Sequence, residues 1–253
     1  MKAWQRWRIS LRAESVRLGG ARGPLVRVAV PLGFALPLAV TFGVAAVAEH
    51  VQSAGGILQA QSVDTTNAAY WPIYLGSIVF AALGAWAQAT AGSRVLRAAA
   101  PWSGLDQLAR WCFLGALAAA ATLLSVSLCL LLLPTFFPVL YGQVNFFAGL
   151  RMVALGPVYA WLAVGYGVAL GRLLRSPALS IAALTVWALL VENALWLIPG
   201  GARLTGWLPF LNGVFATGQD VALFPPWSRD GALVYFAAVG VALWLSSLRR
   251  RLD

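Results

Sequence analysis

The chain has 253 residues, of which 60% are hydrophobic and only 10% are charged, and its formal net charge is +10. Soluble domains carry about 25% charged residues, so this composition excludes an ordinary soluble protein and favours one embedded in a bilayer. The arginines occur in short blocks between apolar runs. They form no separate basic domain with interleaved aromatic residues, which argues against nucleic acid as a partner.

The first twenty residues, MKAWQRWRISLRAESVRLGG, predict an amphipathic helix. Trp4, Trp7, Leu11 and Leu18 fall on one side of a helical wheel, and arginines occupy much of the remainder. Such a helix is typical of the headgroup layer of a membrane, where Trp4, Trp7 and Leu11 would anchor its apolar side among the membrane lipids. A disordered basic tail held by anionic lipid is the alternative.

Six apolar runs are each long enough to cross a bilayer, which requires about 20 residues. Their unbroken apolar character predicts helices. Pro31 and Pro37, with Gly33 and Gly43 nearby, predict kinks or close helix contacts in the first of them. We therefore expect an all-α membrane protein with a single transmembrane domain over residues 1–253. The six predicted spans are 24–48, 70–89, 111–133, 152–170, 178–198 and 231–248.

The basic residues are distributed unevenly around these spans. All of them except Arg151, Arg203 and Arg229 lie on one side of the predicted arrangement. Cytoplasmic loops of membrane proteins carry an excess of lysine and arginine. We therefore expect a multi-pass protein of the cell (inner or plasma) membrane with both termini in the cytoplasm.

The segment between the second and third spans, TAGSRVLRAAAPWSGLDQLARW at 90–111, is then cytoplasmic. The stretch SRVLRAAA can form two helical turns before Pro101 ends the helix. Ser103 and Asp106 form a capping pattern that predicts a second helix continuing into the third span. A short cytoplasmic helix of this kind can contact another protein. The alternative is that it only packs on the lipid headgroups.

One acidic residue, Glu192, falls within the fifth predicted span, about two turns from its outer end. An ionisable residue at such depth normally needs a partner or a water-filled cavity. Arg151 opens the fourth span from the same side, so the two residues could form an ion pair in the outer leaflet. Such a pair would be either a packing contact or part of a polar outer gate. Glu49 and His50 end the first span and are interpreted as interfacial.

The segment 199–229 is rich in leucine, phenylalanine and tryptophan, yet prolines and glycines interrupt it repeatedly. This pattern fits neither a full span nor a solvated loop. It predicts short helices that lie on the outer leaflet or dip into it, where irregular backbone must be covered by protein or line a cavity. Simple docking of the aromatic residues at the interface is the alternative.

The sequence lacks the common catalytic motifs: it has no G-x-S-x-G, no H-E-x-x-H and no G-x-x-x-x-G-K-[ST]. Cys112 and Cys129 lack the spacing of metal ligands and are interpreted as small buried residues. We therefore expect no catalytic residues, no metal and no cofactor in this chain, and we do not expect it to be an enzyme. If ATP drives the protein, a partner ATPase must bind the ATP and Mg.

The order of these parts resembles the permease subunit of bacterial type-2 ABC exporters. The resemblance rests on the amphipathic N-terminal helix, the broken segment at 90–111, GVALGRLLRSPALSIAALTVWALLVENALW at 167–196 and GWLPFLNG at 206–213. In that family the loop between the second and third spans is a coupling helix that contacts the ATPase. The resemblance assigns this role to residues 93–101, with Ser93, Arg94, Val95, Arg97 and Pro101 as the contact residues.

The resemblance further implies a complex of two permease subunits, identical or related, with two ABC ATPase subunits. The substrate path would lie between the permeases, and the substrate exported would be an amphipathic, lipid-like, drug or peptide molecule. Two other classes remain open. One is a non-transporting membrane scaffold, sensor or immunity protein. The other is a secondary transporter, which would be expected to show inverted repeats.

Overall fold

The computed structural model describes residues 3–19, 23–53, 67–91, 104–142, 145–195, 198, 201–221 and 225–249. Within these ranges the chain is helical and has no strand. Six stretches of helix in the described chain are long and apolar enough to cross a membrane: Leu25–Ser53, Tyr70–Ala91, Gly104–Phe136, Phe146–Leu174, Pro177–Ala194 and Arg229–Arg249. The six predicted spans are thus confirmed as helices, and the protein belongs to the all-α membrane class.

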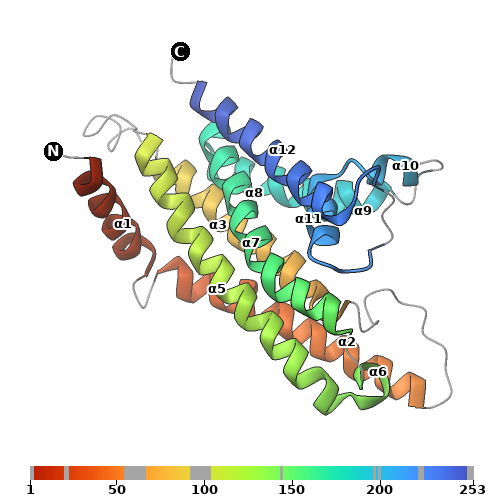
Figure 1. Ribbon diagram of the computed structural model, residues 1–253. Coiled ribbons are helices and arrows are strands. Elements are labelled where there is room, and N and C mark those ends of the chain that lie inside the picture. Colours follow the sequence, from red (N-terminus) through yellow and green to blue (C-terminus); the bar gives the residue numbers. More distant parts are fainter. Residues whose placement is uncertain are drawn as a thin grey trace.

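The stretches Leu25–Ser53 and Pro177–Ala194 each consist of more than one element, and short helices follow the third and fifth stretches (Figure 1). In chain order the elements are α1 (Ala3–Gly19), η1 (Leu25–Ala35), α2 (Leu36–Ser53), α3 (Tyr70–Ala91), α5 (Gly104–Phe136), α6 (Pro138–Tyr141), α7 (Phe146–Leu174), α8 (Pro177–Thr185), η4 (Val186–Val191), α9 (Glu192–Ala194), α10 (Ala202–Thr205), α11 (Pro209–Ala216) and α12 (Arg229–Arg249).

Helices α3 and α7 form the centre of the bundle. In their apolar windows 72% and 56% of the residues are buried, against 17% in α12. Gly167 and Gly171 of α7 face the backbone of α3. A Cβ atom on Gly167 would lie 1.8 Å from the carbonyl oxygen of Ala81, and one on Gly171 would lie 2.3 Å from that of Ala85. Small residues four positions apart allow this close approach of two membrane helices.

The elements η1 and η4 are wider than α-helices. The Leu36 N–H at the end of η1 donates to the Pro31 carbonyl, five residues back. Pro31 has no N–H of its own and cannot continue the α-helical pattern, which agrees with the distortion predicted there. In η4, Tyr74 of α3 donates its hydroxyl hydrogen to the Ala188 carbonyl. This contact with another helix helps to hold the wide turn, and the residues of η4 alone do not predict it.

Helix α5 is longer than the predicted third span and starts at Gly104. A helix of this length measures about 50 Å, whereas the hydrocarbon layer is about 30 Å thick. Helix α1 lies along its first turns (Figure 1). Ser10 of α1 contacts Asp106 of α5, and Glu14 contacts Arg110, each four residues further along its helix. The two helices therefore run in the same direction.

The interrupted segment 199–229 contains the short helices α10 and α11, and short helices are what the sequence predicts there. Helix α11 is buried and packs against α7 and α12. The rings of Phe210 and Phe236 lie with centroids 5.8 Å apart. Phe236 lies seven residues, or about 10 Å, beyond Arg229 at the start of α12. Its contact with Phe210 therefore places α11 about 10 Å inside the bundle, measured from the start of α12.

Candidate functional site

The residues predicted to contact an ATPase, Ser93, Arg94, Val95, Arg97 and Pro101, lie outside the described residues. Their contact role therefore stays a prediction. The structure does describe the two helix ends that flank them. Helix α3 ends at Ala91, and α5 begins at Gly104. The polar contacts at these two ends define the candidate site.

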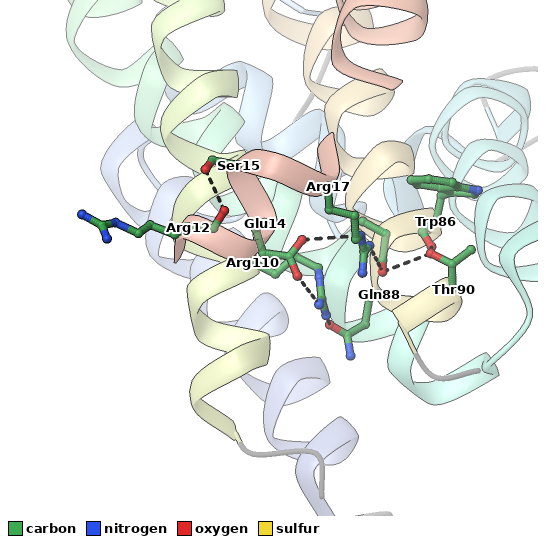
Figure 2. Close-up of polar contacts among 9 residues, drawn as sticks. Arg12, Glu14, Ser15, Arg17, Trp86, Gln88, Thr90 and Arg110 are labelled. Carbon is green, nitrogen blue, oxygen red and sulfur yellow. Dashed lines mark hydrogen bonds and ion pairs between the residues drawn. The ribbon is translucent and has the colours of Figure 1, made fainter. Parts of the chain in front are cut away.

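Arg110 occupies the centre of this site (Figure 2). Its side chain is buried on α5. Through Nη2 it donates to a carboxylate oxygen of Glu14 on α1, and through Nη1 it donates to Oε1 of Gln88 on α3. Glu14 and Gln88 are themselves buried. One guanidinium group thus joins three helices, and its charge is matched by a carboxylate, as a buried ion requires.

Arg17 adds a second contact between α1 and α3. Its Nη2 donates to the Ala87 carbonyl oxygen at 2.5 Å, and its Nε lies 3.8 Å from Glu14 Oε2. Burial lowers the pKa of the Arg17 guanidinium, the Glu14 carboxylate raises it, and the nearby Arg110 charge lowers it. The last turn of α1 is therefore attached to the last turns of α3, directly before the segment predicted to contact a partner.

Gln107, one turn before Arg110 on α5, extends the site to two more helices. Its Oε1 accepts from Nη1 of Arg172 on α7, and its Nε2 donates to Ser247 Oγ on α12 at 3.0 Å. We refer to Glu14, Gln88, Gln107, Arg110, Arg172 and Ser247 together as the α5 polar cluster. All six side chains are buried. The cluster joins α1, α3, α5, α7 and α12 at one end of the bundle.

The α5 polar cluster was not recognised in the sequence. Its partners are far apart along the chain, and Arg110 was counted only as one of the basic residues of a loop. Two signals could have pointed to it. Glu14 is the only acidic residue among the first twenty, and Gln107 and Arg110 sit one turn apart at the edge of an apolar run. A charge within a buried helix face calls for an opposite charge nearby.

The three predicted membrane anchors lie on α1 but differ in exposure. Trp4 is 65% exposed, while Trp7 and Leu11 are half-buried. Leu18, the fourth residue of the predicted apolar side, is fully buried in a core cluster with Leu114 and Phe80. Part of that side therefore packs on the bundle. The contact of Trp4, Trp7 and Leu11 with lipid headgroups stays a prediction.

At the other end of the bundle, the structure gives Arg151 and Glu192 separate partners instead of an ion pair with each other. Arg151 pairs with the Asp230 carboxylate at the start of α12, and its Nε donates to the Ala216 carbonyl at 2.8 Å. Glu192 is fully buried and accepts hydrogen bonds from the backbone N–H groups of Phe210 and Leu211, at 3.1 and 2.8 Å.

These two N–H groups belong to the first turn of α11, whose residue Leu208 provides no side-chain cap. The first N–H groups of a helix lack intrahelical acceptors and carry a partial positive charge. The Glu192 carboxylate supplies the missing acceptors, and its Oε1 also accepts from Trp187 Nε1 at 3.0 Å. The buried charge therefore needs no arginine partner, and the predicted ion pair between Arg151 and Glu192 does not form.

Glu49 has the same kind of contact with α6. Its two carboxylate oxygens accept from the backbone N–H groups of Val139 and Leu140, at 2.9 and 3.0 Å. Both α6 and α11 begin with a proline, Pro138 and Pro209, followed by the two donors. Glu49 was predicted to be only interfacial. The structure assigns it and Glu192 a common role, which is to hold the start of a short helix.

Among the described residues, no three histidine, cysteine, aspartate or glutamate side chains gather in a way that could hold a metal ion. Cys129 is buried and Cys112 is half-buried. A scan of protein-family models and searches of curated proteins and of solved structures found no match to this chain.

Proposed function

We propose that this chain is the membrane-spanning permease subunit of an ATP-driven exporter of the type-2 ABC class. The observation that carries the proposal is the position of the α5 polar cluster. Gln88 and Arg110 lie close to the two helix ends that flank residues 92–103, and they bond directly to each other. A partner that displaces this segment would move α3 and α5 and, through Glu14, Gln107 and Ser247, also α1 and α12.

The chemical energy in this scheme comes from a separate subunit. The sequence carries no G-x-x-x-x-G-K-[ST] motif and only one lysine, Lys2. ATP and Mg would bind to two copies of the partner ATPase. Closure of the ATPase pair would push on residues 93–101, where Arg94 and Arg97 are the proposed contacts. Rigid-body rotation of packed elements is a common way in which such a local push becomes a global change.

The proposal fixes an orientation in the cell membrane. Arg17, Arg110 and Arg172 in or beside the α5 polar cluster and Arg249 at the end of α12 lie at one end of the bundle. Because positive charge is enriched on the cytoplasmic side, we place this end and both termini in the cytoplasm. Helix α11 and Glu192 then lie on the outer side, where an exported substrate would leave.

A second permease subunit completes the proposed complex. The first and fifth spans have only 28% and 22% buried residues in their apolar windows. Their uncovered faces are available for a second copy or a related chain, with the substrate path between the two and the first and fifth spans as its wall. The apolar character of these faces favours an amphipathic, lipid-like, drug or peptide substrate.

The decisive experiment isolates the tagged chain from its native membrane in mild detergent and identifies bound proteins by mass spectrometry. We expect an ABC ATPase whose ATP hydrolysis depends on the permease. The double variant Arg94→Glu/Arg97→Glu should lose this ATPase, whereas Arg203→Glu, on the opposite side, should retain it. Assembly and ATPase stimulation that survive the double variant would refute the contact assignment.

Reconstitution of the purified chain in sealed vesicles distinguishes the proposed exporter from the two alternative classes of protein. A secondary transporter would move solute when the purified chain alone is placed in sealed vesicles. A scaffold, sensor or immunity protein would neither transport solute nor associate with an ATPase. Either result would overturn the proposed function.

A further inference from the structure

Two charged positions border the apolar layer along α7. Near one end of the helix, Arg172 contacts Gln107 of the α5 polar cluster. Near the other end, Arg151 pairs with Asp230 at the start of α12. Arg151 and Arg172 are 21 residues apart, or about 32 Å along the helix. This distance matches the thickness of a hydrocarbon layer, about 30 Å.

Helix α5 continues well beyond the level of Arg151. Its residue Thr122 packs against Gly156 of α7, where an added Cβ atom would lie 3.4 Å from Thr122 Cγ2. From this contact α5 runs 14 residues, or about 21 Å, to Phe136. Arg151 lies only five residues, or about 7.5 Å, from Gly156 in the same direction. The end of α5 therefore projects about 13 Å farther from the α5 polar cluster than Arg151 does.

This projecting end has an apolar surface. It lies at the far end of the bundle, where α2, α5 and α6 pack together (Figure 1). Large side chains that are more than half exposed occur there on three helices, and we call them the apolar tip: Leu131 and Phe136 of α5, Val139 of α6, and Phe146 and Phe147 of α7. An exposed apolar surface of this kind marks contact with another molecule or with lipid.

The surface of α5 identifies acyl chains as the occupant. Exposed leucines continue along this helix from the middle of the span into the tip, at Leu123, Leu124 and Leu131. The sequence has no charged residue from 111 to 150, so no charge on α5 separates the tip from the rest of the span. A protein that docks outside the membrane would be expected to meet a polar rim there.

Charged groups mark where water begins on the two sides of the bundle. Beside the tip, the partly exposed Glu49 binds the start of α6 and is followed by the exposed His50. Beside α12, the Asp230 side chain is 81% exposed. An exposed carboxylate is costly inside the acyl layer. Water therefore reaches Asp230, although the apolar tip extends farther from the α5 polar cluster.

We propose that acyl chains of the bilayer cover the apolar tip up to the level of Glu49, whereas beside α12 the hydrocarbon layer ends at Arg151 and Asp230. The layer then reaches up to about 13 Å farther along α5 than along α12. A bilayer accommodates such an inequality by local thickening or by tilt of the helices. This inference is independent of the proposed exporter function, since it requires only that the bundle stands in a bilayer.

Spin labelling of the full-length chain in phosphatidylcholine vesicles tests this boundary. Cys112 and Cys129 are replaced with alanine, and a nitroxide is attached to Leu131→Cys, Phe147→Cys or Ser228→Cys. Ser228 is exposed directly before α12, and its replacement leaves the pair of Arg151 and Asp230 intact. The measurement compares collisions of the nitroxide with oxygen, which concentrates in hydrocarbon, and with a water-soluble nickel chelate. The ratio of oxygen to nickel collisions should be severalfold higher at positions 131 and 147 than at 228.

Leu124→Cys is the matched reference, because Leu124 is exposed in the middle of α5. Positions 131 and 147 should give the same lipid-type ratio as position 124. Frequent nickel collisions at 131 and 147 would place the tip in water, and rare collisions with both reagents would show that protein covers it. Either result overturns the proposal. A lipid-type ratio at position 228 also overturns it, because the hydrocarbon layer would then reach beyond Asp230.

Discussion

The guanidinium group of Arg110 on α5 and the carboxylate of Glu14 on α1 form a buried ion pair between residues 96 positions apart in the sequence. This pair attaches the N-terminal helix to the start of the third span. Because Gln88 binds the same guanidinium, the attachment also includes the end of α3. A substitution in this pair should therefore weaken the attachment between α1, α3 and α5.

Replacing Glu14 with alanine should destabilise the protein by about 3 kcal/mol, because it leaves the buried Arg110 charge without its partner. Thermal unfolding in detergent measures this loss. Hydrogen exchange should show faster exchange of the α1 backbone, while the centre of α7 should be unaffected.

Arg12→Ala provides the control, since Arg12 lies on the exposed side of the same helix. The exchanged pair Glu14→Arg/Arg110→Glu should recover part of the loss. If Glu14→Ala and Arg12→Ala have equal effects, the ion pair does not hold α1 in place.

Glu192 and Glu49 offer a matched comparison at the other end of the bundle, because both accept two backbone N–H groups from the start of a short helix. Glu192 is fully buried, while Glu49 is partly exposed. Glu192→Ala should cost about 3–5 kcal/mol, since two backbone donors and the Trp187 indole lose their acceptors away from water. Glu49→Ala should cost only about 1 kcal/mol, because water can replace its carboxylate.

Unfolding of the two glutamate variants in the same detergent measures the difference. A larger loss for Glu49→Ala would contradict the assignment of α11 as the buried, dependent helix. The double variant should show additive losses, as expected for sites without shared contacts.

The contact between α3 and α7 should be intolerant of added side chains. Gly167→Ala places a methyl group against the Ala81 carbonyl and must push the two helices apart, so a loss of several kcal/mol of stability is expected. Gly43→Ala is the control: within the described residues nothing lies within 4 Å of a Cβ atom there. That variant should be neutral or stabilise the protein by up to about 1 kcal/mol, because alanine favours the helix. Thermal unfolding of the two variants should differ clearly, and equal midpoints would exclude the tight crossing.

The proposed orientation can be tested by chemical labelling. Cys112 and Cys129 are first replaced with alanine, and single cysteines are then placed at Arg203 or Arg249. A membrane-impermeant maleimide added to intact spheroplasts should label position 203, and position 249 only after permeabilisation. The reverse pattern would place the α5 polar cluster outside the cell and refute an ATPase contact there.

The six spans could be predicted because each is an apolar run of about 20 residues or more, which is the signature of a membrane-spanning helix. The early start of α5 followed from the capping pattern of Ser103 and Asp106. The short helices after the fifth span followed from the spacing of prolines and glycines. In each case the signal lies within about twenty neighbouring residues.

The partners of the charged residues could not be predicted in the same way. Glu192 was matched with Arg151 because both carry charge, whereas backbone N–H groups of α11 satisfy it instead. Donors of this kind are present at every helix start, so the sequence does not show which carboxylate accepts hydrogen bonds from them. The wide turn η4 likewise accepts a hydrogen bond from Tyr74, more than a hundred residues earlier in the chain.

The crossing of Gly167 and Gly171 over α3 has a consequence for motion. With only hydrogen atoms between the two backbones, α3 and α7 cannot slide along each other without losing their contact. They should behave as a fixed pair, at a constant separation in every state of the protein. Any rearrangement would then take place between this pair and the other four spans, whose apolar windows are at most 33% buried.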